Sequence, residues 1–169
     1  MDFEIFTAET EEDYQEFGRL IADYVDWCRR RHHDQPDVVD KVFGHQALDD
    51  ELKIISTSYG PPDSKTLLVR RQGKIVGGGA YRRLDNEICE LKRVYIDEGQ
   101  QGIGIGRALC LALMNSAKEE GFRIVRLDTG KRLTEAISLY ESLGFRHIES
   151  YHEYPEEFLN YMYFMERPL

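Results

Sequence analysis

The chain has few cysteines and no long apolar run. Its 169 residues include three cysteines, Cys28, Cys89 and Cys110, and no two of them form a CxxC pair. Because a disulfide framework or a zinc site needs paired or clustered cysteines, neither is indicated, and we expect a reducing compartment. The first residues, MDFEIFTAETEED, lack the basic region and apolar core of a secretory signal, and no later run approaches membrane-spanning length. We therefore expect a cytoplasmic protein that does not enter a membrane.

Positive charge is also scarce. Lys and Arg total 22 against 31 Asp and Glu, which gives a formal net charge of -9. Nonspecific nucleic-acid binding needs Lys and Arg to neutralise phosphates, so this balance argues against a nucleic-acid partner. It weakly favours a cationic or amine partner, although ordinary solubility explains an acidic surface equally simply. With 41% hydrophobic residues, the length suits one globular domain over residues 1–169.

Two common nucleotide-binding patterns are missing from the glycine-rich run ELKRVYIDEGQQGIGIGRALCLAL, residues 90–113. A Walker loop ends in Gly-Lys-Ser/Thr, whereas Gly106 is followed by Arg107 and Ala108. A dinucleotide fingerprint needs a third glycine five residues after the first, and Arg107 or Leu109 stands there instead. The run therefore indicates neither a nucleoside triphosphatase loop nor a Rossmann loop.

The same run predicts a strand, a tight loop and a helix. Val94, Tyr95 and Ile96 have the β-branched and aromatic character of a strand. Glycines between positions 99 and 106 allow tight turns, and small and apolar residues from 108 to 117 repeat at helical spacing. A loop of small residues at a helix start leaves backbone N–H groups unpaired at the positive end of the helix dipole. Such a loop is suited to a phosphate or pyrophosphate group.

The remaining elements are predicted from spacing, capping and turn residues. Thr10 is expected to cap a long helix that ends near Arg31, with acidic residues in its first turn and arginines in its last. Glycines 77, 78 and 79 inside one strand indicate a bulge or a close backbone approach. The other predictions are strands at 3–7, 67–71, 74–83, 124–128, 147–151 and 161–165, helices at 46–55 and 133–143, and a loop at 59–63. The segment 32–62 is otherwise expected to be less regular.

Three short patterns, in order, resemble the GCN5-related N-acetyltransferases. Gln101, Gly104 and Gly106 match the Gln/Arg-x-x-Gly-x-Gly/Ala loop with which that family binds the pyrophosphate of acetyl-CoA. The segment AISLYESLGF, residues 136–145, is similar to the family's A-x-x-L-Y-x-x-x-G-F segment, and the strand ELKRVYI precedes the loop. The resemblance covers residue 67 to the C-terminus. It departs from the family at 97–98, where proline is often found, and at 133–134, where asparagine is common.

The resemblance implies an α/β acyl-CoA N-acyltransferase fold, in which a mixed, mostly antiparallel twisted sheet is flanked by helices on both sides. It also implies acetyl-CoA as the cosubstrate and no metal. The residues that would hold the cosubstrate are Val94, Tyr95, Ile96, Gln101, Gly102, Ile103, Gly104, Ile105, Gly106 and Arg107. Among these, the loop amides would bind the pyrophosphate.

The chemistry implied by the resemblance is direct attack of a primary amine on the acetyl thioester. Tyr140 matches the family's position for the acid that protonates the departing thiolate, and Glu90 would deprotonate the acceptor through water. Backbone N–H groups around Val94 and Tyr95 would stabilise the tetrahedral intermediate. Glu90 faces the same side as Val94 only if the strand between them is unbroken, and partial burial in the cleft would raise its pKa.

Each of these assignments has an alternative. Tyr140 shares a helix face with Ile137 and Leu143 and so fits a core position, and Glu90 fits a solvated strand face. A noncatalytic acyl-CoA-binding or regulatory module would keep the same loop, and a flavin or nucleotide binder would use it for another anion. The acceptor stays open between a small-molecule amine, a free amino acid and a peptide or protein amine. A homodimer is compatible with the sequence.

Overall fold

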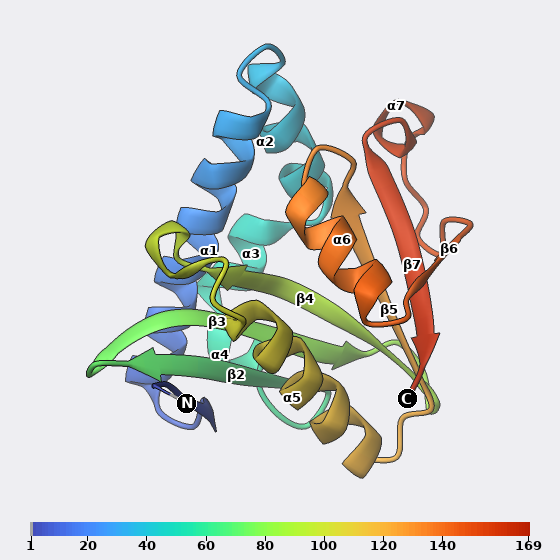
Figure 1. The fold of residues 1–169 in the computed structure, drawn as a ribbon. Coiled ribbons are helices and arrows are strands. Elements are labelled where there is room, and N and C mark those ends of the chain that lie inside the picture. The colour runs from blue at the N-terminus through green and yellow to red at the C-terminus, as the bar shows by residue number, and fades with distance from the viewer. Residues whose placement is uncertain (1) are drawn as a thin grey trace.

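A computed structural model describes residues 2–169, which form a seven-stranded sheet with helices on both faces (Figure 1). The strands are β1 (Glu4–Thr7), β2 (Ser64–Arg71), β3 (Lys74–Arg83), β4 (Ile88–Ile96), β5 (Ile124–Gly130), β6 (Arg146–Ile148) and β7 (Met162–Pro168). Their order is β1-β2-β3-β4-β5-β7-β6, and neighbours are antiparallel except for the parallel pair β4 and β5. The expected mixed, mostly antiparallel sheet is confirmed.

The helices divide between the two faces of the sheet. They are α1 (Glu11–Arg31), α2 (Pro36–His45), α3 (Leu48–Lys53), α4 (Ile55–Ser58), the 3-10 turn η1 (Glu98–Gln100), α5 (Ile105–Glu119), α6 (Thr134–Ser142) and α7 (Glu156–Leu159). One buried cluster packs α5 against the sheet and includes Leu109 and Leu113. The other packs α1 against the opposite face and includes Phe17 and Ile21. Figure 1 shows α5 in front of the sheet and α1 behind it.

The start of α1 is built as its sequence predicts. The Thr10 hydroxyl accepts a hydrogen bond of 3.1 Å from the Asp13 N–H, and the Asp13 carboxylate accepts one of 2.9 Å from the Thr10 N–H. This capping box pairs N–H groups that have no partner within the helix, and arginines occupy the last turn of α1. The apolar face of α1 is buried against the sheet, which carries Tyr24 and Trp27 to the edge of the site described below.

The segment 32–62 is more regular than its sequence suggested. α2 begins with Pro36, a residue suited to the first helical turn because its missing N–H needs no partner there. Burial of Val39 and Val42 then fixes this short helix against the rest of the protein. The single helix predicted at 46–55 is wrong, because the backbone leaves helical geometry at Ala47 and again at Ile54 and so forms α3 and α4 instead.

The parallel strands β4 and β5 separate part of the way along their length. Residues 88–90 of β4 pair with 124–126 of β5, and no pairing joins the two strands beyond these residues in the described part of the chain. Leu91 and Leu127, the next residue on each strand, both line a cleft that opens there. The separation therefore creates a site at the carboxyl ends of two neighbouring parallel strands.

On its other edge, β4 carries a bulge. Gly78 of β3 pairs with Tyr95 of β4, and Ala80 of β3 pairs with Lys92 of β4. One residue of β3 therefore lies between these two pairs, opposite two residues of β4. Arg93 takes up the extra position with a φ of 56°, and a Cβ on Gly79 would lie 2.9 Å from a Val94 methyl carbon. The bulge predicted from the glycines is confirmed. Because a bulge adds one residue to a strand, the side chains before and after it alternate out of phase.

Candidate active site

A cleft with a volume of about 410 Å³ lies between β4 and β5 and is bounded by α1, α5 and α6. Eight of the ten residues predicted to hold the cosubstrate line it: Val94, Tyr95, Ile96, Gln101, Gly102, Gly104, Gly106 and Arg107. The other two do not, because the Ile105 side chain is buried in the core and the Ile103 side chain is exposed. The fold therefore brings the end of β4 and the glycine loop to one cavity.

The loop between β4 and α5 depends on glycine at two positions. Gly102 has a φ of 79° and Gly104 a φ of 89°, a backbone region that residues with a Cβ rarely adopt. The Gln101 side chain folds back and donates a hydrogen bond of 2.8 Å to the Ile96 carbonyl, which ties the loop to the end of β4. The backbone of the loop is thus set before any ligand binds.

The first turn of α5 is open to an anion. The helix begins after Gly104 with no side-chain cap. Within residues 2–169, no backbone partner is found for the N–H groups of residues 102–107, whereas the Ala108 N–H donates to the Gly104 carbonyl at 3.1 Å. Arg107 adds a positive side chain to the same wall of the cleft. Unpaired amides at a helix start attract phosphate groups, so this wall fits a pyrophosphate.

Gly106, in the first turn of α5, bears on whether this wall fits a pyrophosphate. Its φ lies outside the left-handed region, and a Cβ built there would meet only ordinary contacts, the nearest being Leu139 at 3.6 Å. Neither backbone strain nor packing within the protein therefore requires glycine at this position. A Cβ on Gly106 would instead enter the cleft that this residue lines. Glycine at this position is what close approach of a ligand to the backbone would require.

Tyr140, from α6, belongs to the core and to the cleft together. Its ring packs edge-on against Phe145 at 5.7 Å, and 8% of the residue is exposed. It also lines the cleft, and among the described residues no hydrogen bond occupies its hydroxyl. Burial raises the pKa of this phenol well above its usual range, so the hydroxyl is protonated near neutral pH.

Glu90 does not line the cleft. Because the bulge lies between Glu90 and Val94, their side chains face opposite sides of the sheet. Val94 packs against the α5 cluster, whereas the Glu90 carboxylate is bonded to His152 and lies 3.6 Å from Arg82. The Glu90 side chain is 0% exposed. The alternative interpretation of Glu90 as a residue on a solvated strand face is therefore wrong.

The pKa of Glu90 is lowered, not raised. Burial alone favours the neutral acid, but the Lys92 ammonium lies 3.0 Å from Oε1, and His152 and Arg82 add further positive or hydrogen-bonding partners. A raised pKa was predicted for a Glu90 that faces the cleft, and the structure does not meet that condition. The prediction also considered burial without these partners, which outweigh it. A carboxylate held in its ionised form in this way is a weak base.

A second cavity, of about 60 Å³, adjoins the cleft. The two cavities share Tyr24, Arg93, Asp128, Thr129 and Leu133. From these shared residues, the second cavity extends between α1, α2 and the start of β7. The site therefore has two arms that meet at the carboxyl end of β5.

Asp128 supplies a carboxylate at this junction, and the sequence analysis gave it no role. Its Oδ2 accepts a hydrogen bond of 3.0 Å from the Tyr154 hydroxyl. The available signal was its place at the end of a strand that runs parallel to its neighbour, which is where open α/β sheets bind ligands. That signal depends on knowing which strand β5 pairs with.

Arg93 was also missed. Its guanidinium donates to the Tyr59 hydroxyl at 3.0 Å and to Gln46 Oε1 at 2.7 Å, and it lies 3.4 Å from Glu51. These contacts join β4 to the helices that cover it. Arg93 therefore forms a rigid wall of the junction, and its position depends on the bulge.

Two kinds of feature are absent from residues 2–169. No group of three or more His, Cys, Asp or Glu side chains in this part of the chain is arranged to hold a metal ion. None of its helices is both long enough and apolar enough to cross a membrane.

The sequence matches the model of the acetyltransferase (GNAT) family over residues 21–145. It is 37% identical over 109 residues to an uncharacterized N-acetyltransferase of Escherichia coli, and this alignment covers 63% of this chain and 65% of that protein. It is 29% identical over 153 residues to an uncharacterized N-acetyltransferase of Schizosaccharomyces pombe, which covers 89% of this chain and 87% of that protein. The chain thus spans just under two thirds of the first relative and most of the second.

The fold is also found in a solved structure. The PaiA N-acetyltransferase of Thermoplasma acidophilum, in complex with coenzyme A, superimposes with a TM-score of 0.72 over 100% of both chains, at 18% sequence identity. Together with the match over residues 21–145, the cleft and its glycine loop lead to one conclusion. The chain belongs to the acetyltransferase (GNAT) family, a family of acetyl-CoA-dependent acyltransferases.

Proposed function

We propose that the protein transfers the acetyl group of acetyl-CoA to a primary amine by direct attack within a ternary complex. The observation that carries this proposal is the junction of the two cavities at Asp128. The glycine loop lines the cleft, and the smaller cavity approaches the same carboxylate from between α1 and α2. Two arms of one site allow donor and acceptor to be bound together, which removes the need for an acyl-enzyme.

The cysteines support direct attack. All three are buried, and burial raises the pKa of the Cys28 and Cys110 thiols to about 12. The thiolate is the nucleophilic form of cysteine, so neither thiol is activated to accept the acetyl group. Cys28 lines the smaller cavity but is held in its neutral form.

In the proposed step, the nitrogen of the neutral amine forms the C–N bond while the C–S bond of the thioester breaks. The amine loses one proton, and the departing thiolate takes up one. Backbone N–H groups of β4 beyond residue 90 are proposed to stabilise the charge on the carbonyl oxygen, since β4 has no pairing with β5 there.

Tyr140 is the proposed proton donor to the thiolate. Its raised pKa supports this role because it keeps the phenol protonated, and its place in the cleft supports contact with the leaving group. A phenol with a raised pKa is a weak acid. Its contribution is therefore expected mainly as a hydrogen bond to the departing sulfur.

Two carboxylates are candidates for the group that receives the acceptor's proton. Asp128 lines both arms of the site and accepts a hydrogen bond from Tyr154. Glu90, the base predicted from the sequence, is enclosed by Lys92, Arg82 and His152. We propose Asp128 as the carboxylate that faces the incoming ammonium. Glu90 would act as a base only through waters leading from the cleft, and paired variants distinguish the two.

An acceptor screen with a thiol-release assay tests this function. Purified protein and acetyl-CoA are incubated with alkylamines, free amino acids and peptides with a free N-terminus, and coenzyme A release is followed against an acceptor-free control. At least one amine class is expected to accelerate release and to gain an acetyl group by mass spectrometry. If acetyl-CoA binds but no amine accelerates release, the protein is a noncatalytic acyl-CoA-binding module instead.

A further inference from the structure

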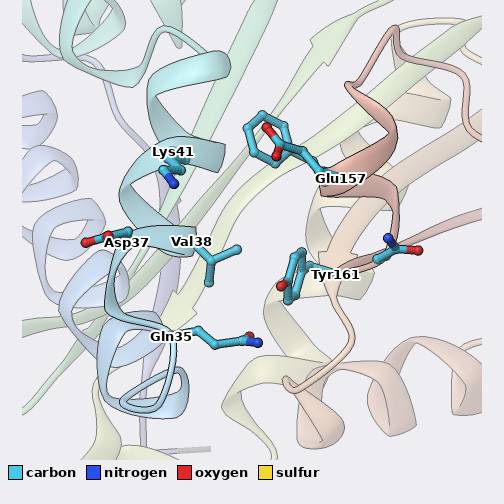
Figure 2. Close-up of a pocket in the computed structure, with 8 residues that line it drawn as sticks. Gln35, Asp37, Val38, Lys41, Glu157 and Tyr161 are labelled. Atoms are coloured by element: carbon cyan, nitrogen blue, oxygen red, sulfur yellow. The ribbon is translucent and has the colours of Figure 1, made fainter.

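A third cavity, of about 330 Å³, opens to solvent between α2 and α7 (Figure 2). It shares Val38 and Tyr161 with the 60 Å³ cavity, which in turn shares Asp128 with the cleft. The three cavities therefore adjoin one another in series and outline a path from an outer opening, through a narrow neck, to the junction with the cleft. The outer opening and the neck do not include the glycine loop proposed to bind the cosubstrate.

The neck restricts the shape of whatever passes through it. Its walls include the apolar side chains of Val39, Val42, Phe43, Leu133 and Met162. A cavity that accepts a benzene ring measures about 150 Å³, more than twice the 60 Å³ of the neck. The neck is therefore too small for a ring. Its apolar side chains suit methylene groups, and among chains of the same composition an unbranched one has the smallest cross-section.

Charges stand at both ends of the path. The Asp128 carboxylate lies at the inner end, beside Arg93, whose positive charge is paired with Glu51 at 3.4 Å. At the outer opening, Lys41 comes from α2 and Glu157 from α7, on opposite sides of the cavity (Figure 2). Among the residues that the structure describes, neither Lys41 nor Glu157 has an oppositely charged group within 4.0 Å. Asp37 also lines this cavity, but its carboxylate points away from Glu157 and Tyr161 (Figure 2). The remaining positive and negative groups, on opposite sides of the cavity, are complementary to a zwitterion.

We propose that the acceptor is a free α-amino acid with an unbranched side chain that ends in a primary ammonium. Its side chain passes through the neck and brings the terminal nitrogen to Asp128, while its carboxylate faces Lys41 and its α-ammonium faces Glu157. The terminal ammonium loses two protons. Asp128 accepts the first and passes it to solvent. The neutral nitrogen then forms the new C–N bond as the thioester C–S bond breaks, and the second proton that the nitrogen loses balances the one taken up by the thiolate. This proposal rests on the proposed amine acetylation and deepens it by naming the substrate class.

Binding of acceptor analogues to the complex of the protein with coenzyme A tests the proposed path without turnover. Isothermal titration compares L-lysine with L-norleucine, which lacks the terminal ammonium, and with cadaverine, which lacks the carboxylate. We expect L-lysine to bind at least about threefold more tightly than either, because each analogue leaves one charged group of the path unpaired. Equal binding of L-lysine and L-norleucine would overturn the proposal, since the terminal ammonium would then make no favourable contact with Asp128.

A charge reversal at the opening makes the test sharper. Lys41→Glu should weaken L-lysine binding about three- to tenfold and should not weaken cadaverine binding, because cadaverine has no carboxylate to be repelled. Lys118→Glu is the matched control, since this exposed lysine in the last turn of α5 changes the net charge equally without lining the path. An equal loss for both ligands, or no loss for L-lysine, contradicts the assignment of Lys41.

The proposed substrate class and the proposed function can fail separately. Tight binding of L-lysine with no acetyl transfer to any amine would contradict the function and support the binding path. Transfer to aromatic or branched amines, with no detectable binding of L-lysine, would overturn the substrate class and support the function.

Discussion

Tyr154 donates a hydrogen bond of 3.0 Å to one oxygen of Asp128. The Tyr154 hydroxyl in turn accepts one of 2.7 Å from Gln46, whose side-chain oxygen is bonded to Arg93. The segment that carries Tyr154 lies in the chain between β6 and α7, far from β5 in sequence. This contact orients the Asp128 carboxylate, and within residues 2–169 its other oxygen has no hydrogen-bond partner, as the proposed role toward an ammonium requires.

Asp128→Asn is expected to lower kcat/KM for the acceptor by about 10²- to 10⁴-fold while leaving acetyl-CoA binding unchanged. The amide cannot take up the proton that the ammonium must lose. The defect should shrink as the pH approaches the pKa of the amine, about 10, since free amine is then abundant. Rates measured from pH 6 to pH 10 check this. A defect of the same size at every pH would mean that Asp128 only positions the acceptor.

The Glu90→Gln variant distinguishes two roles for Glu90, that of a catalytic base and that of a structural ion-pair partner. Because the pKa of Glu90 is lower in the folded state than its unfolded value of about 4.3, the ionised carboxylate stabilises the fold above that pH. The stabilisation is lost as the pH falls from about 4.3 toward the lower folded value. We expect the variant to lose about 1–3 kcal/mol of unfolding free energy at pH 7 and to approach the parent in acid.

Urea unfolding at pH 7, 5 and 3 measures that difference. Glu87→Gln is the matched control, because Glu87 forms an exposed ion pair with Arg123 and should lose less than about 1 kcal/mol. Thiol release by Glu90→Gln completes the test. A rate defect near neutral pH that shrinks at higher pH would restore Glu90 as the base predicted from the sequence.

Tyr140→Phe should fold normally, bind acetyl-CoA and turn over more slowly. Only the hydroxyl is removed, and the ring keeps its packing against Phe145. The expected loss in kcat is near the lower end of about 10²- to 10⁴-fold, because a thiolate is a fair leaving group. Tyr163→Phe removes a hydroxyl from an exposed position and serves as the control. Unchanged turnover in Tyr140→Phe, with an acceptor for which chemistry limits the rate, would make Tyr140 a core residue alone.

Gly106→Val should abolish the response to acetyl-CoA without disturbing the fold. At a concentration of 100 times its Kd, acetyl-CoA should raise the Tm of the parent by about 5–10 °C. The valine side chain would occupy the space beside the first turn of α5. Gly44→Val is the control, since Gly44 is also helical, has open space around it and does not line the cleft. Equal stabilisation of both variants would place the cosubstrate elsewhere.

The glycine loop could be predicted because its conformation is local. Gly102 and Gly104 need a backbone region that favours glycine, and the Gln101 side chain bonds to a carbonyl five residues away. The same holds for the capping box at the start of α1. In each case, the residues that determine the structure are neighbours in the chain, so their pattern is sufficient.

The neck and its outer opening could not be predicted in the same way. The last turn of α2 is held by contacts between His45 and Tyr154 and between His45 and Phe158, side chains from distant parts of the chain. The sequence of a short helix does not reveal such partners. The neck and its outer opening exist because these segments pack together.

The sequence by itself determined the glycine loop, the strand before it and the position of Tyr140 on a helix face. The tertiary structure alone decided which carboxylate lies at the junction. Glu90 and Val94 are four residues apart on one strand, but the register between β3 and β4 forces a bulge at Arg93 and turns Glu90 away. Asp128 reaches the cleft because β5 separates from β4 before that residue. The direction of a strand side chain depends on pairing with other strands, and the strand's own residues do not determine that pairing.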